Sequence, residues 1–87
     1  MDLKECREKL DVIDEKIVRL FEERMEISEQ VAAYKAEHGL PVLDAVREQQ
    51  KLAAVTELVS DPKNRESAAA LFEKIMELSR QRQESII

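Results

Sequence analysis

Apolar side chains recur at helical spacing through the first 38 residues, a stretch that contains neither glycine nor proline. Asp2 and Glu5 have the spacing of a helix N-cap, and Gly39 and Pro41 follow as stop signals. The pattern predicts one unbroken helix of about 35 residues, roughly 50 Å long. Its apolar face consists of Leu3, Cys6, Leu10, Ile13, Ile17, Leu20, Ile27, Val31 and Tyr34.

Two shorter helices are predicted after the turn at residues 38–43. Asp44 can cap a helix that runs to about Val59, and a break at residues 60–64 separates it from a third helix, from about Arg65 to about Ser85. There is no strand pattern, repeat or interdomain linker. We therefore expect a single all-α domain over residues 1–87, with three helices per chain and a very long first helix.

The predicted length of the first helix exceeds the size of the domain. A compact domain of this size has a radius of gyration near ~12 Å, and therefore a diameter of roughly 30 Å. The helix must project from such a monomer, and its apolar face needs cover from another chain. The simplest arrangement that supplies this cover is a dimer.

Cationic residues interrupt the apolar face of the first helix. Arg24, Ser28, Val31 and Lys35 lie within about 40° of one line, whereas Arg7 lies about 100° around the helix and about 25 Å along it from Arg24. If two such helices pack antiparallel, Arg7 of one chain can approach Arg24 of the other. The alternative is that these are surface side chains whose stems cover apolar area.

Composition narrows the range of ligands. The chain is acidic, with a net charge of −5 and an isoelectric point near 4.9, which argues against binding to nucleic acid or to an anionic membrane. An anion would need a local pocket of cations. One cysteine and one histidine argue against a disulfide framework and a metal site, and without a signal peptide or membrane span we expect a soluble, cytoplasmic protein.

Polar residues share faces on the two shorter helices as well. Asp44, Arg47 and Glu48 have the spacing that groups side chains at the start of the second helix. Ser79 and Gln83 continue the apolar face of the third helix. Each group is also typical of exposed helix ends, but together with Arg24 and Lys35 they indicate a shared site.

The order and spacing of these residues resemble those of the all-helical class of chorismate mutases. The resemblance covers nearly the whole chain and rests on L-x-x-x-R-x-x-x-D-x-x-D-x-x-I-x-x-L-x-x-E-R-M from Leu3 to Met25, V-A-A-Y-K ending at Lys35, P-V-x-D-x-x-R-E from Pro41 to Glu48, and the pair Ser79 and Gln83.

This resemblance implies an intertwined homodimer with two active sites that rearranges chorismate to prephenate without a cofactor or metal, on the way to phenylalanine and tyrosine. Arg24 and the partner's Arg7 would bind the two substrate carboxylates, supported by Ser79 and Arg47. The ring hydroxyl would be held by Glu48 and the backbone near Asp44. Lys35 and Gln83 would both donate to the ether oxygen.

These roles agree with the chemistry of a unimolecular rearrangement, which needs confinement of the reactive conformer and donors aimed at developing charge. Arginine suits the carboxylates because its planar group binds them with fixed geometry, and lysine supplies a concentrated charge. Two alternatives stay open. One is a lyase of the same fold that removes pyruvate from isochorismate, and the other is a non-catalytic helical dimerisation module.

Overall fold

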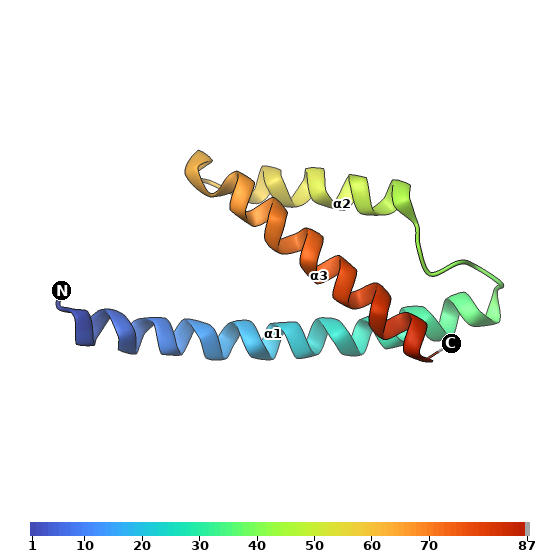
Figure 1. Ribbon diagram of the computed structural model, residues 1–87, viewed down its shortest axis with the longest axis horizontal. Helices are drawn as coiled ribbons and strands as arrows, with labels where there is room; N and C mark the ends of the chain where they lie inside the picture. The colour runs from blue at the N-terminus through green and yellow to red at the C-terminus, as the bar shows by residue number, and fades with distance from the viewer. Residues whose placement is uncertain (87) are drawn as a thin grey trace.

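The computed structural model describes residues 1–86 and shows three α-helices, with no strand in this range. The helices are α1 (Leu3–Glu37), α2 (Ala45–Leu58) and α3 (Arg65–Ile86), and a 3₁₀ turn, η1 (Pro62–Asn64), leads into α3 (Figure 1). The all-helical class and the three predicted helices are confirmed. Among the described residues, none of the helices combines the length and the apolar character that a membrane span requires.

The predicted helix ends form by local hydrogen bonding. The Asp2 carboxylate accepts from the backbone N–H of Glu5 at 2.8 Å, and the Asp44 carboxylate accepts from that of Arg47 at 3.0 Å. Each bond satisfies a backbone donor that has no partner within its helix. Gly39 has φ +64°, a conformation that glycine adopts at little cost, and α1 ends just before it. Interactions between residues close together in the sequence therefore determine where these helices begin and end.

Helix α3 holds the three helices together. It lies obliquely between the other two, packing against α2 and against the second half of α1, while α1 and α2 make no close backbone contact (Figure 1). One buried apolar residue from each helix marks this small core: Ala32, Val55 and Met76. The space between α1 and α2 is thus bounded by α3 on one side.

The first half of α1 projects beyond the rest of the chain. The Cα radius of gyration is 16.0 Å, and the longest dimension of the chain, 54 Å, runs along α1 (Figure 1). The apolar side chains there are uncovered: Leu10 is 55% exposed, Ile17 56% and Leu20 65%. The predicted projection of α1 is confirmed, and within residues 1–86 more than half of the surface of each of these side chains stays uncovered.

We predict that enlarging Ala32 destabilises the fold. Ala32 is 0% exposed and lies on the face of α1 that meets α3, so a leucine there must push the two helices apart. Ala32→Leu should lower the free energy of unfolding by about 1–3 kcal/mol. The control is Ala33→Leu, at an exposed position of the same helix. Equal urea midpoints for the two variants would contradict the packing described here.

Candidate active site

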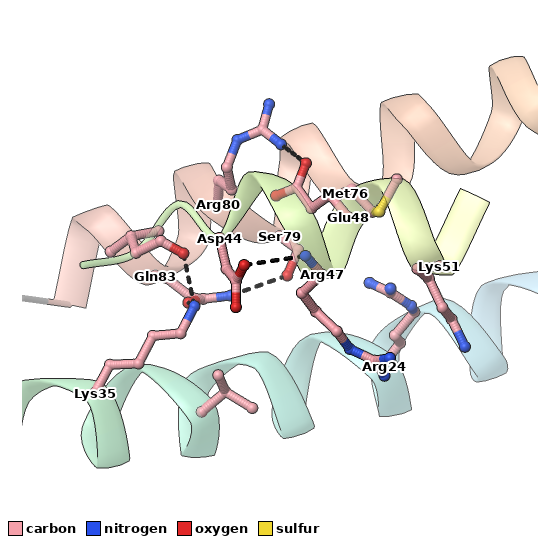
Figure 2. A pocket seen from close by; sticks show the side chains of 12 residues that line it. Arg24, Lys35, Asp44, Arg47, Glu48, Lys51, Met76, Ser79, Arg80 and Gln83 are labelled. Carbon is pink, nitrogen blue, oxygen red and sulfur yellow. Dashed lines mark hydrogen bonds and ion pairs between the residues drawn. The ribbon is translucent and has the colours of Figure 1, made fainter. Parts of the chain in front are cut away.

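A cavity of about 180 Å³ lies between α1, α2 and α3. All three helices and the connection after α1 contribute to its wall (Figure 2). The lining residues are Arg24, Val31 and Lys35 from α1, Val42 and Asp44 from the connection, Arg47, Glu48 and Lys51 from α2, and Met76, Ser79, Arg80 and Gln83 from α3.

The structure brings together all the site residues predicted from the sequence except one. The residues that line the cavity as predicted are Arg24, Lys35, Asp44, Arg47, Glu48, Ser79 and Gln83. Arg7 is exposed on the projecting half of α1, about 25 Å from Arg24 along the helix axis. Within one chain, Arg7 is therefore outside this cavity.

Helical spacing explains why each helix presents its residues as a group. On α2, Arg47 and Lys51 are four residues apart and follow the capping residue Asp44, so they share one face. On α3, Ser79 and Gln83 have the same spacing, and they are 8% and 6% exposed because this face meets α1. The cavity lies where these faces converge.

Lys35 joins α1 to the connection that follows it and to α3. Its Nζ donates to the backbone oxygen of Val42 at 2.6 Å and to Gln83 Oε1 at 3.3 Å. The first bond holds the connection after α1 against the helix, and the second joins α1 to α3. An ammonium group has three donors, so one N–H of Lys35 is left for a ligand in the cavity.

Gln83 is oriented by its two neighbours. Its Oε1 accepts from Lys35, so its amide nitrogen must point the other way, where it donates to Ser79 Oγ at 3.3 Å. Ser79 Oγ also lies 2.6 Å from Ser28 Oγ on α1. The second N–H of the Gln83 amide is available to a ligand. Lys35 and Gln83 therefore present donors from neighbouring positions.

Positive charge collects in the cavity although the chain as a whole carries −5. Five cationic side chains line it together with the two carboxylates of Asp44 and Glu48. The Glu48 carboxylate is already paired with the Arg80 guanidinium. Such an excess of cations in a concave site favours a small anion.

Four of the five cationic side chains lie at the two ends of the cavity (Figure 2). Arg24, Arg47 and Lys51 gather at one end, and Lys35 lies with Gln83 at the other (Figure 2). Among the described residues, none of the three cations at the first end forms an ion pair. This end can bind a carboxylate, while the other end offers neutral and cationic donors to a second polar atom.

Two charged residues of the wall, Lys51 and Arg80, were not predicted. Lys51 is four residues after Arg47, a spacing that could have revealed it. Arg80 directly follows Ser79 and becomes part of the wall through its pairing with Glu48. They were missed because, in the sequence, their charges cannot be told from those of an ordinary exposed helix face.

A family model for chorismate mutase type II matches residues 6–84, a range that includes Arg7 and every residue of the cavity wall. The chain belongs to this family. The resemblance drawn from the sequence is thereby confirmed. Within residues 1–86, no group of three or more histidine, cysteine, aspartate or glutamate residues could hold a metal ion.

One curated relative is the T-protein of Haemophilus influenzae (strain ATCC 51907 / DSM 11121 / KW20 / Rd), which is 38% identical to the chain over 52 residues. The aligned segment is 60% of this chain and 14% of the T-protein, so the chain spans only a small part of that relative's length. No solved structure matches the chain.

Proposed function

We propose that the cavity is the active site of a chorismate mutase, which converts chorismate to prephenate for the synthesis of phenylalanine and tyrosine. The observation that carries this proposal is the cationic cavity in a chain of this family, with the donors of Lys35 and Gln83 opposite unpaired cations. We expect the reaction to take place in the cytoplasm, as predicted from the sequence.

Catalysis of this reaction requires a binding site of suitable shape and charge. In this [3,3] rearrangement, the ether C–O bond breaks as a C–C bond forms in one intramolecular step, so no proton or electron is exchanged with the protein. The protein must select the compact conformer in which the two carbons meet. It must also stabilise the negative charge that develops on the ether oxygen.

The two ends of the cavity suit different polar groups of the substrate, and this assigns a role to each residue. Arg24 and Arg47 bind one substrate carboxylate at the cationic end, with Ser79 as a further donor. Lys35 and Gln83 each donate their remaining N–H to the ether oxygen. Both groups are held in place before substrate arrives, so little reorganisation is needed as charge develops.

Glu48 and Asp44 serve the ring hydroxyl in this proposal. The hydroxyl donates to the Glu48 carboxylate and accepts from the backbone near Asp44. Glu48 is paired with Arg80, and a carboxylate has enough lone pairs to keep that partner while it accepts a further hydrogen bond.

The proposed enzyme is an intertwined homodimer in which the partner's Arg7 completes each site. Support comes from the uncovered apolar face of α1 and from the distance between Arg7 and the cavity of its own chain. Antiparallel pairing of two α1 helices would cover that face and bring the partner's Arg7 close to Arg24.

In such a dimer, we predict that folding and dimer formation are coupled. A folded 10.1 kDa monomer in sedimentation equilibrium at micromolar concentration would contradict this arrangement.

The alternatives considered from the sequence are not favoured. A lyase acting on isochorismate would also use a cationic pocket, but the family match describes a mutase. A purely structural dimerisation module would leave unexplained why three helices direct polar side chains into one cavity.

We predict that the protein converts chorismate to prephenate and that this activity depends on Lys35. Lys35→Ala should lower kcat/KM by about a hundredfold or more, because it removes a donor to the developing charge. The control is Lys63→Ala, which removes an exposed lysine outside the cavity. Chorismate consumption and prephenate formation are measured directly. Failure of the wild type to convert chorismate, conversion of isochorismate alone, or equal rates for the two variants would contradict the proposal.

We predict a change of pH dependence in Gln83→Glu. The new carboxylate would pair with Lys35 and repel the charge that builds on the ether oxygen, whereas the protonated acid could donate to that oxygen. Activity should be lost at neutral pH and partly recovered in acid. The matched control is Gln81→Glu, at an exposed position of the same helix. A flat pH–rate profile for folded Gln83→Glu would remove Gln83 from its proposed role.

A further inference from the structure

A buried hydroxyl behind the cavity has no role in the site described so far. Ser28 on α1 is 6% exposed and does not line the cavity. Its Oγ lies 2.6 Å from the Oγ of Ser79, which does line the cavity. Burying two hydroxyls at the crossing of α1 and α3 is less favourable than packing two apolar side chains of the same size there, because each hydroxyl must find a hydrogen-bond partner. Their presence therefore points to a function.

The direction of this hydrogen bond follows from what each hydroxyl can reach. A serine hydroxyl has one proton and two lone pairs. Within residues 1–86, Ser79 Oγ is the only hydrogen-bond partner of Ser28 Oγ. If Ser79 donated to Ser28, the proton of Ser28 would be buried without an acceptor, which is unfavourable. Ser28 is therefore the donor and Ser79 the acceptor.

A second donor reaches the same oxygen. The amide nitrogen of Gln83 donates to Ser79 Oγ at 3.3 Å, and the amide cannot turn around without losing the bond from Lys35 to its oxygen. Ser28 and Gln83 together fill both lone pairs of Ser79. The one hydrogen-bonding capacity that Ser79 keeps is its own proton, which is then free for an acceptor in the cavity.

We propose that Ser28 is a positioning residue that makes the Ser79 hydroxyl a dedicated donor to a carboxylate of the ligand. It acts through Ser79 and touches no substrate. The inference rests on the proposed function for the identity of the ligand, whereas the direction of the hydrogen bonds depends only on the structure. Without Ser28, one lone pair of Ser79 is unfilled, and its hydroxyl is free to turn and accept a bond instead of donating one.

The test is a double-mutant cycle with Ser28→Ala and Ser79→Ala, read as KM and kcat for chorismate. Ser28→Ala should raise KM about three- to tenfold, the effect of one net hydrogen bond, with little change in kcat, because the carboxylate is bound equally in the ground and transition states. In the Ser79→Ala background, Ser28→Ala should have no further effect. Ser67→Ala, at an exposed position near the start of α3, is the control.

The outcomes separate this inference from the proposed function. An unchanged KM for Ser28→Ala, or an equal loss in both backgrounds, would overturn the role of Ser28. Should the wild type leave chorismate unchanged, the proposed function fails, and the same cycle is then read calorimetrically as affinity for a rigid bicyclic dicarboxylate. If Ser28→Ala does not fold, Ser28→Cys replaces it, because its thiol fills the space but donates weakly, and it should also raise KM.

Discussion

The length of α1 is the constraint on which the rest of the structure depends. The chain measures 54 Å along its longest axis, the direction in which α1 runs (Figure 1), and two shorter helices that share one small core cannot cover a helix of this length. α3 covers only the second half of α1, so the chain divides into a packed end with a polar cavity and a projecting end with an apolar face (Figure 1). The proposed active site and the proposed dimer are consequences of this division.

At the packed end, the same polar side chains join the helices and orient the hydrogen-bond donors of the cavity. Ser28, Ser79, Gln83 and Lys35 form a continuous hydrogen-bonded series between α1 and α3. Burying polar atoms in so small a core is unfavourable unless they are paired, and this pairing also orients each group. The same contacts that hold α3 on α1 therefore point donors into the cavity, and the excess of cations around it favours an anionic ligand.

The helices and much of the site could be predicted because their signals are local. Capping by Asp2 and Asp44 and the stop at Gly39 depend on neighbouring residues, and helical spacing alone groups Ser79 with Gln83. The roles of these residues came from the family resemblance.

Other features depend on how one helix sits against another, which a sequence pattern does not specify. The pairing of Arg80 with Glu48 requires α3 to lie beside α2 in one register. The bond between Ser28 and Ser79 joins residues far apart in the sequence. The role of Arg7 is still a prediction, because it concerns a second chain.

The role of Arg7 is tested most directly by mixing two inactive variants, Arg7→Ala and Lys35→Ala, unfolding them and refolding them together. In a mixed dimer, one site has both Lys35 and an intact Arg7 from the partner, and the other has both defects. Random pairing should restore up to about a quarter of wild-type activity. A mixture that stays inactive although mixed dimers form would contradict a site shared between chains.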